Sequence, residues 1–242
     1  MSEKITPYKD KNTTKKEQVT EMFDTISGNY DGLNRVISFG IDVKWRKKVV
    51  NIVANTNPNR VLDVATGTGD LAINLVKSGA SEIIGLDISV GMLEVGKDKI
   101  KAKKLDHIIS MVKGDGESLP YEENYFDAIT VAFGVRNFED LKQGLSEIYR
   151  VLKPGGIFVV LETSIPTKTP YKQGFKLYSS TILPLIGKIF SKDRSAYSYL
   201  SESAAAFPYG DAFNNILGKI GFIEVEDNPQ TFGVATIYTA TK

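Results

Sequence analysis

The 242-residue chain contains no cysteine and one histidine, His107. The lack of cysteine excludes disulfides and thiolate metal sites and is compatible with a reducing compartment. A single histidine argues against histidine-based catalysis and histidine metal clusters. The net charge is only +1, so no overall field indicates nucleic acid as a partner. The chain also lacks an apolar signal core and any run long enough to span a membrane. We therefore expect a cytoplasmic protein without a metal site.

The length suits a single α/β domain, and apolar runs alternate with segments of helical spacing. Strands are expected over residues 61–64, 83–86, 108–113, 126–133 and 157–161, and helices over residues 15–27, 42–54, 89–104, 141–152 and 209–220. Two closing strands are expected over residues 222–226 and 230–239, joined by a turn at Asp227-Asn228-Pro229. This alternation predicts βαβ units and a parallel sheet.

A glycine-rich turn follows the first strand, where Gly67 and Gly69 permit a tight bend and the close approach of a ligand. Asp63 lies just before this turn. Asp87 follows 24 residues later, at the end of the second apolar run. The carboxyl ends of parallel strands meet at one edge of a sheet, so these acids are expected around a nucleoside-type ligand.

A third acid supports the same prediction. Asp115 and Gly116 follow the third apolar run, where the acid would accept a hydrogen bond from an adenine amino group. Asp87 would accept the ribose hydroxyls, and Ile88 follows it directly. Met92, in the next helix, would lie under the adenine, and ordinary core filling is the alternative for this side chain.

The turn is compatible with two cofactors. Gly67-x-Gly69-x-x-Ala72 formally fits a dinucleotide fingerprint, which binds a pyrophosphate at the helix start. Asp70 occupies that start, Asp63 precedes the turn, and no lysine or arginine nearby in the sequence offsets them. S-adenosylmethionine has no phosphate and carries an ammonium and a sulfonium, so the residues favour it. A dinucleotide oxidoreductase, a module that binds without catalysis and a turn that only packs a helix on the sheet are the alternatives.

The fourth strand runs directly into Gly134-Val135-Arg136-Asn137. A cation and an amide at the carboxyl end of a buried strand face the ligand crevice. Arg136 is therefore a candidate catalytic residue, and a salt bridge to Glu139 or Asp140 is the alternative. Glu162 ends the fifth strand on the same side of the sheet.

Three segments fall outside the regular alternation. Residues 1–16 are polar and predicted to form a solvated tail. Residues 17–55, which include Tyr30 and Asp31, are expected to form a helical lid, with a cap packed on the sheet as the alternative. Residues 165–206 are expected to form a helical insertion over the substrate site, with an apolar helix at residues 175–190.

Longer motifs identify a family. Tyr30-Asp31-x-Leu33-Asn34-x-x-Ile37-Ser38 with Trp45 forms one signature, and the stretch from Arg150 to Ser164, RVLKPGGIFVVLETS, forms a second. Gly134-Val135-Arg136-Asn137 and Tyr197-x-Tyr199-Leu200 are further shared segments. From about residue 15 to the end, the chain resembles the ubiquinone/menaquinone biosynthesis C-methyltransferases, within the class I S-adenosylmethionine-dependent methyltransferases. It departs from the usual pattern at Leu33, Asp42 and Ala132, where the family more often has Met, His and Ser.

The resemblance implies a Rossmann-like class I fold with a seven-stranded, mostly parallel sheet, helices on both faces and an antiparallel last strand. It implies cofactor contacts at Thr68, Asp87, Asp115 and Gly116, with Asp63, Gly67, Gly69, Ile88 and Met92 around them. It also implies methyl transfer from S-adenosylmethionine to a ring carbon of a prenylated quinol, which we interpret as demethylmenaquinol. A benzoquinol or another aromatic or lipid acceptor is the alternative.

The chemistry of such a transfer suggests roles for the remaining residues. A ring hydroxyl must lose its proton to raise the electron density of the ring, and a nearby cation helps. We expect Arg136 to stabilise the quinolate and Asn137 to orient it, while Tyr199, Tyr30 or Asp31 would accept the proton. A prenyl tail implies contact with the inner face of a membrane, through residues 175–190. A homo-oligomer remains open.

Overall fold

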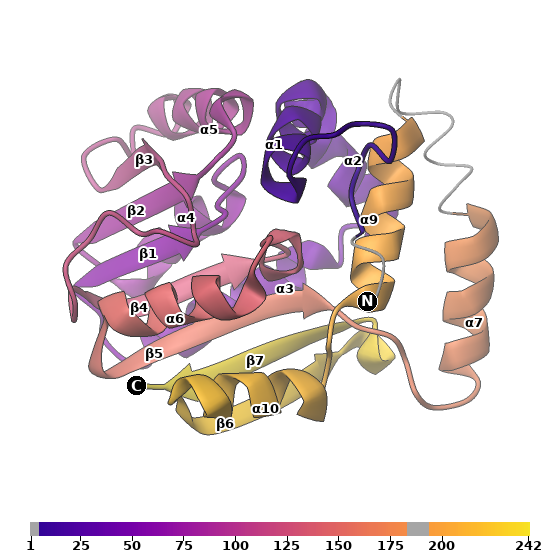
Figure 1. Ribbon diagram of the computed structural model, residues 1–242. Helices are drawn as coiled ribbons and strands as arrows, with labels where there is room; N and C mark the ends of the chain where they lie inside the picture. Colours follow the sequence, from indigo (N-terminus) through magenta and orange to yellow (C-terminus); the bar gives the residue numbers. More distant parts are fainter. Residues whose placement is uncertain (1–4, 183–193) are drawn as a thin grey trace.

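The computed structural model of the chain describes residues 5–182 and 194–242 (Figure 1). Its centre is a seven-stranded sheet with the strand order β3-β2-β1-β4-β5-β7-β6. The strands are β1 (Arg60–Val64), β2 (Glu82–Asp87), β3 (Ile109–Lys113), β4 (Phe126–Ala132), β5 (Leu152–Thr163), β6 (Ile223–Gln230) and β7 (Ala235–Thr241). The first five are parallel, and β7 runs antiparallel between β5 and β6. The fold expected from the resemblance is confirmed.

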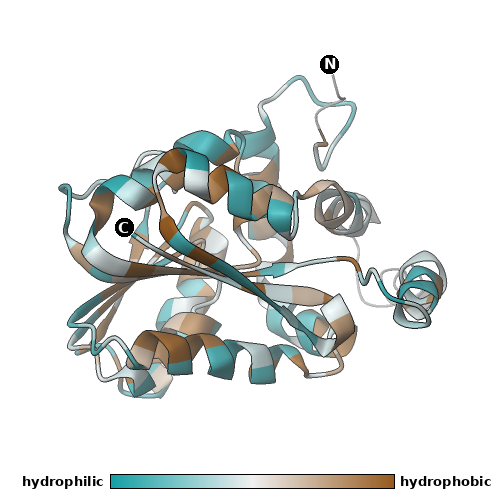
Figure 2. Ribbon diagram, turned by 90° about the horizontal axis from the view of Figure 1, so that it is seen from below, coloured by the Kyte–Doolittle hydropathy of each residue, from teal (hydrophilic) through white to brown (hydrophobic). Residues whose placement is uncertain are grey.

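Helices cover both faces of this sheet, as Figure 2 shows. The helices α3 (Asp42–Ala54), α4 (Asp70–Leu75) and α5 (Val90–Ala102) pack on one face, and α6 (Leu141–Val151) and α10 (Asp211–Ile220) pack on the other. Successive strand residues point to opposite faces, so Val61 joins the first core and Leu62 the second. Both faces of the parallel strands are therefore buried, which explains their nearly continuous apolar runs.

A third group of helices lies at the edge toward which the parallel strands point (Figure 1). It consists of α1 (Lys15–Ile26), α2 (Tyr30–Ile37) and α9 (Arg194–Ala206), with the short turn η1 (Ser27–Asn29) between the first two. Helix α1 begins with a capping box, in which Thr14 and Glu17 satisfy each other's backbone amides. Met22 of α1 packs against Tyr199 of α9 in a small core of their own. This group covers the carboxyl ends of β1, β2 and β4.

The prediction of a turn at Asp227-Asn228-Pro229 is wrong. Strand β6 continues through these residues to Gln230, and the chain turns at η5 (Thr231–Gly233) instead. Because β6 is an edge strand, Pro229 can lack a backbone N–H without leaving a ladder hydrogen bond unmade. Strand β5 likewise begins at Leu152, earlier than expected, and runs through the Pro-Gly-Gly sequence.

The segments outside the regular alternation are also helical in part. Within residues 165–206, α7 (Tyr171–Leu177) leads into a π-helical turn, η4 (Tyr178–Ile182), so the expected helix at 175–190 begins earlier. Its part beyond residue 182 lies outside the described residues. Of the expected solvated tail, Pro7 is buried and the Tyr8 amide donates to Gln18 Oε1 at 2.9 Å. Within the described ranges, no helix is long and apolar enough to cross a membrane.

Candidate functional site

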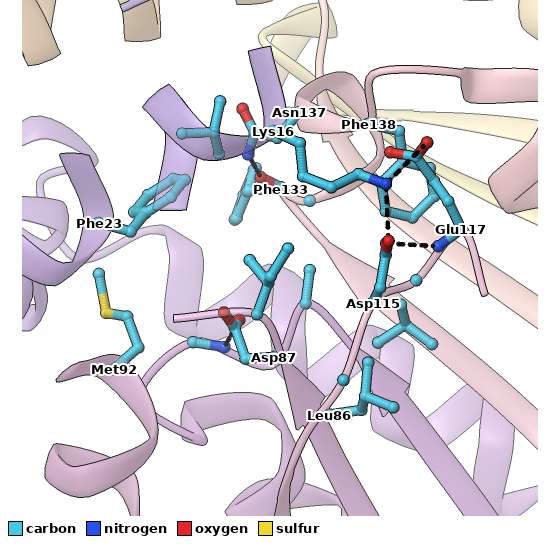
Figure 3. A pocket seen from close by; sticks show the side chains of 18 of the residues that line it. Lys16, Phe23, Leu86, Asp87, Met92, Asp115, Glu117, Phe133, Asn137 and Phe138 are labelled. Carbon is cyan, nitrogen blue, oxygen red and sulfur yellow. Dashed lines mark hydrogen bonds and ion pairs between the residues drawn. The ribbon is translucent and has the colours of Figure 1, made fainter. Parts of the chain in front are cut away.

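A cavity of about 80 Å³ lies at the carboxyl ends of β1, β2 and β4, beneath α1 and α2 (Figure 3). Its lining comes from all of these elements and from the loops that follow β3 and β4: Lys16, Val19, Phe23, Tyr30, Val64, Ala65, Gly67, Leu86, Asp87, Ile88, Met92, Gly114, Asp115, Gly116, Glu117, Ala132, Phe133, Gly134, Asn137 and Phe138. Six of the expected cofactor contacts are among them: Gly67, Asp87, Ile88, Met92, Asp115 and Gly116. The topology therefore brings together residues from distant parts of the chain.

Backbone conformation marks the floor of this cavity. Ala65 and Phe133 follow β1 and β4 with φ values of 52° and 59°, which only a few per cent of non-glycine residues adopt. Gly134 follows Phe133, and a Cβ on it would lie only 2.6 Å from the Ala65 Cβ. The loops after β1 and β4 therefore approach each other too closely for a side chain at position 134. Such local strain tends to collect at functional sites.

The glycine-rich turn is enclosed from above and from the side. Gly67 and Gly69 have φ values of 58° and 76°, and Gly69 is the N-cap of α4. A Cβ on Gly67 would lie 3.9 Å from the ring of Tyr30, so α2 covers the turn. From the side, a Cβ on Gly96 of α5 would meet the Thr68 backbone at 3.2 Å. The Gly67 amide donates to Asp87 and the Gly69 amide to the Thr66 carbonyl at 3.0 Å, so hydrogen bonds within the protein hold this bend.

Asp87 links this turn to the cavity. Its carboxylate accepts hydrogen bonds from the Gly67 amide at 2.8 Å and the Ser89 amide at 2.9 Å. Burial raises the pKa of Asp87, and the backbone hydrogen bonds only partly oppose that effect. The carboxylate lies in the lining, where it can accept hydroxyl groups of a ligand.

Asp115 is covered by a residue of α1. Its Oδ2 accepts a hydrogen bond from Lys16 Nζ at 2.6 Å, and its Oδ1 accepts the Glu117 amide at 2.9 Å (Figure 3). Lys16 Nζ also lies 3.5 Å from Glu117. Burial opposes the charge of Lys16, but the two acids outweigh it and raise its pKa. The sequence offers no signal for this lysine, since the fold alone places α1 over the cavity.

Asp63 lies beneath the turn and outside the cavity lining. It is 1% exposed, and its two oxygens accept hydrogen bonds from Thr66 and Thr130, both at 2.6 Å. Burial raises its pKa to about 6, although both hydroxyls lower it. This carboxylate ties β1 to β4 and fixes the start of the turn.

Thr68 and Asp31 bind each other rather than the cavity. Thr68 Oγ1 donates to Asp31 Oδ1 at 2.5 Å, and Lys99 Nζ donates to Asp31 Oδ2 at 2.7 Å. Lys99 also pairs with Asp70 at 2.5 Å, and Arg35 pairs with Asp70 at 3.3 Å. The premise that no cation offsets Asp70 is therefore wrong, because α5 and α2 bring two cations to it. The charge of the turn thus gives no argument against a dinucleotide.

Arg136 forms a buried ion pair with Glu162 at the end of β5. Its partner is therefore neither Glu139 nor Asp140, the acids expected nearby in the sequence. The side chains of Arg136 and Glu162 are 7% and 0% exposed, and neither belongs to the cavity lining. Arg136 Nε and Glu162 Oε2 have no hydrogen-bond partner. The pair thus leaves one donor and one acceptor available.

Asn137 connects this pair to α9. Its Oδ1 accepts a hydrogen bond from the Tyr199 hydroxyl at 3.1 Å, and its Nδ2 donates to the Phe133 carbonyl at 3.4 Å. Burial strongly raises the pKa of Tyr199, so this hydroxyl stays protonated. Asn137 lines the cavity, and Tyr199 supports it from behind.

The donor set suits S-adenosylmethionine. Asp87 would hold the ribose hydroxyls, and the apolar Leu86 and Met92 would contact the adenine. Lys16 and Phe23 of α1 line the same cavity, so this helix closes it on one side. Among the described residues, no group of acids and histidine could hold a metal ion.

Comparisons with known proteins identify the family. The model of the "ubiE/COQ5 methyltransferase family" matches residues 11–242. A demethylmenaquinone methyltransferase of Bacteroides fragilis is 50% identical, with 99% of this chain and 98% of that protein covered. A ubiquinone/menaquinone biosynthesis C-methyltransferase of Geotalea daltonii is 45% identical over 95% of this chain and 98% of that one.

Solved structures share the fold. A putative S-adenosylmethionine-dependent methyltransferase of Methanococcus maripaludis is similar with a TM-score of 0.60 and 24% identity, covering 97% of this chain and 96% of that one. The expected fold, enzyme class and methyl donor are confirmed. The protein uses S-adenosylmethionine and belongs to the ubiE/COQ5 methyltransferase family.

Proposed function

We propose that the protein transfers the methyl group of S-adenosylmethionine to a ring carbon of demethylmenaquinol, giving menaquinol. The observation that carries this proposal is the similarity over nearly the whole chain to proteins named demethylmenaquinone methyltransferase, at 42–50% identity in Bacteroides fragilis, Porphyromonas gingivalis and Staphylococcus saprophyticus. Other relatives carry the name ubiquinone/menaquinone biosynthesis C-methyltransferase, so a benzoquinol is the second candidate acceptor.

The site has two tasks in such a reaction. The sulfonium supplies an electrophilic methyl group, so the protein must hold the ring carbon in line with it, about 3–3.5 Å away. The protein must also remove a proton from a ring hydroxyl, whose pKa is near 10 in water. Closure by α1, α2 and α9 would exclude water, which strengthens the attraction between an anionic ring and the cationic donor. Residues 17–55 thus form the lid in this proposal, and α9, within residues 165–206, covers the acceptor.

We assign the proton to Glu162. Its Oε2 is a buried carboxylate oxygen with no partner, and Arg136 Nε of the same ion pair is an unused donor. The ring O–H would give its proton to Glu162, and Arg136 would donate to the resulting quinolate oxygen. A C–C bond would form between the methyl group and the ring carbon as the S–CH₃ bond breaks, leaving S-adenosylhomocysteine. The substituted ring carbon would then release its own proton to solvent, and Glu162 would return its proton to the ring oxygen, which restores the aromatic quinol.

The other proton acceptors considered are less suited. The Tyr199 hydroxyl already donates to Asn137, and burial raises its pKa. Burial also raises the pKa of Tyr30. The Asp31 carboxylate already accepts hydrogen bonds from Lys99 and Thr68. In this proposal Asn137 and Tyr199 orient the acceptor, and Asp31 fixes α2 on the turn.

Methyl transfer from labelled S-adenosylmethionine tests the function. We expect label in a reduced short-chain demethylmenaquinol, with a higher kcat/KM than for the matching benzoquinol. Absence of product from both acceptors, with cofactor binding shown by calorimetry, would overturn the proposal.

The role of Glu162 has its own test. Glu162→Gln should lower kcat while the Kd of the cofactor stays unchanged, whereas the exposed Glu122→Gln should change neither. The loss of kcat in Glu162→Gln relative to wild type should shrink as the pH approaches about 10, because the ring hydroxyl of the quinol then ionises without a base from the protein. A deficit that stays constant with pH would contradict proton transfer to Glu162.

A further inference from the structure

Helix α7 joins two aromatic contacts at the edge of the molecule, where it lies beyond α9 from the sheet (Figure 1). The Tyr171 ring stacks on Phe232 of the turn between β6 and β7, with centroids 4.0 Å apart. Tyr178 contacts Phe39 at 6.0 Å, and its hydroxyl donates to the Ile37 carbonyl at 2.6 Å. Three segments distant in the sequence therefore form one aromatic surface.

This surface is exposed. The exposed fractions are 72% for Phe39, 65% for Phe232, 64% for Leu177 and 41% for Tyr171. These four are the majority of the seven large hydrophobic residues that are exposed in the described part of the chain. Single exposed apolar side chains are ordinary, whereas contiguous ones mark an interaction surface. Here Tyr171 stacks on Phe232, Phe39 contacts Tyr178, and Leu177 precedes Tyr178 in the chain.

Lysines occur in and next to the segments that carry the aromatic residues. Lys168, Lys172 and Lys176 recur every fourth residue, before and along α7, and all three are exposed. On the other side of the β6–β7 turn, Lys48 of α3 donates to Gln230 Oε1 at 2.6 Å, and Lys44 lies one helical turn before it. The charge of this surface is thus supplied by lysine.

Acidic residues are missing from the same segments. Residues 165–182 and 228–234 contain neither Asp nor Glu. Residues 35–48 contain a single acid, Asp42, which is 3% exposed and paired with Arg46 and Arg35. The whole chain carries a net charge of only +1, so this positive region is local.

We propose that this aromatic–lysine surface docks the protein on a membrane containing anionic lipids. It consists of Phe39, Tyr171, Leu177, Tyr178 and Phe232, with Lys44, Lys48, Lys168, Lys172 and Lys176. Aromatic rings favour the membrane–water interface, and lysines are attracted to anionic headgroups. The inference rests on the proposed function, because a prenylated quinol would be drawn from a membrane. Helix α2 begins at the cavity with Tyr30 and ends beside this surface.

A second copy of the chain fits this surface poorly. A two-fold contact places the same residues of both copies against each other. Lysines would then face lysines, with no acid in these segments to separate them, and like charges repel. Charge complementarity therefore favours an anionic lipid surface over a dimer.

Sedimentation of the full-length protein with vesicles tests the proposal. We expect binding to phosphatidylcholine vesicles containing phosphatidylglycerol, weakened by salt, and little binding to phosphatidylcholine alone. Each lysine near such a surface contributes about a fivefold factor, so Lys168→Gln, Lys172→Gln and Lys176→Gln together should lower partitioning about 100-fold. The matched control is Lys101→Gln, Lys103→Gln and Lys104→Gln at the end of α5, which Figure 1 places on the opposite side of the molecule.

The double variant Leu177→Ser, Phe232→Ser should also bind anionic vesicles more weakly. Its remaining binding should still be weakened by salt, because the lysines are unchanged. Equal binding to neutral and anionic vesicles would overturn the proposal, and so would an equal loss in the control variant. Conversion of a dimer to a monomer by the surface variants, without a change in vesicle binding, would overturn it too.

The vesicles contain no quinol, so their binding is independent of methyl transfer. The triple lysine variant should keep its activity on a soluble short-chain quinol and lose activity on a long-chain quinol in vesicles. Lack of methyl transfer by the wild-type protein would count against the proposed function alone.

Discussion

Substitution of Arg136 should destabilise the protein strongly, because it leaves the Glu162 carboxylate buried without its charge partner. Glu162 is 0% exposed, and its side chain pairs with an arginine side chain that is 7% exposed. Breaking a buried ion pair from one side costs about 3–5 kcal/mol. We expect Arg136→Met, which keeps most of the side-chain volume, to lower the free energy of unfolding by that amount.

Urea unfolding of four proteins measures this effect. Glu162→Gln removes the opposite charge, and the double variant removes both. Replacing a whole buried pair is often nearly neutral, so the double variant should be more stable than Arg136→Met alone. A coupling free energy of about 1 kcal/mol or less in this cycle would refute a tightly coupled buried pair.

The double variant also separates charge from packing. Arg136→Met with Glu162→Gln leaves no uncompensated charge at this position. A double variant as unstable as Arg136→Met alone would therefore mean that lost packing, not charge, is responsible. At neutral pH the double variant should bind S-adenosylmethionine but turn over poorly.

Three further predictions concern the turn and its cover. Asp63 has a pKa of about 6 in the folded protein against 3.8 in the unfolded chain. The free energy of unfolding should therefore fall by about 3 kcal/mol as the pH rises from about 4 to about 6. Asp63→Asn should remove this pH dependence in urea unfolding. Lys16→Met releases Asp115, so cofactor association should be about two- to fivefold faster by stopped-flow fluorescence of Trp45, which lies near Phe133 of the cavity. An unchanged rate of cofactor association in Lys16→Met would contradict a role of the Lys16–Asp115 contact in gating the cavity. Lys99→Met should lower the free energy of unfolding by about 1 kcal/mol and speed hydrogen exchange in α2, because Lys99 binds Asp31 of that helix. Faster exchange in α5 alone would contradict a link between Lys99 and the lid.

Local features of the sequence were sufficient for the frame of the site. The glycines of the turn and the acids Asp87 and Asp115 each follow an apolar strand, and parallel topology alone brings such residues to one edge. Of these residues, Gly67, Asp87 and Asp115 lie in the cavity lining. Asp63 obeys the same rule, yet its side chain points beneath the turn, because Thr66 and Thr130 satisfy it there. Strand periodicity specifies the position of a residue better than it specifies the partner of its side chain.

Partners across the fold could not be predicted. Lys99 meets Asp70 across 29 residues, Arg136 meets Glu162 across 26, and Lys16 meets Asp115 across 99. No local spacing encodes these pairs, since two of them depend on how α1 and α5 pack beside the sheet and the third on the pairing of β4 with β5. The nearest acids in the sequence were therefore the wrong partners for Arg136.

The turn before β7 was misplaced for a different reason. Asp227-Asn228-Pro229 has turn composition, but an edge strand also tolerates proline and polar side chains. Strand order, which sequence pattern does not supply, decides between the two.

Analysis of the product by mass spectrometry and nuclear magnetic resonance tests the central claim most directly. The reaction would contain S-adenosylmethionine with a deuterated methyl group and reduced short-chain demethylmenaquinol. We expect one deuterated methyl group on a ring carbon, with both ring hydroxyls unmodified. A methyl group on a hydroxyl oxygen, or no methylated quinol from protein that binds the cofactor, would contradict C-methylation of demethylmenaquinol at this site.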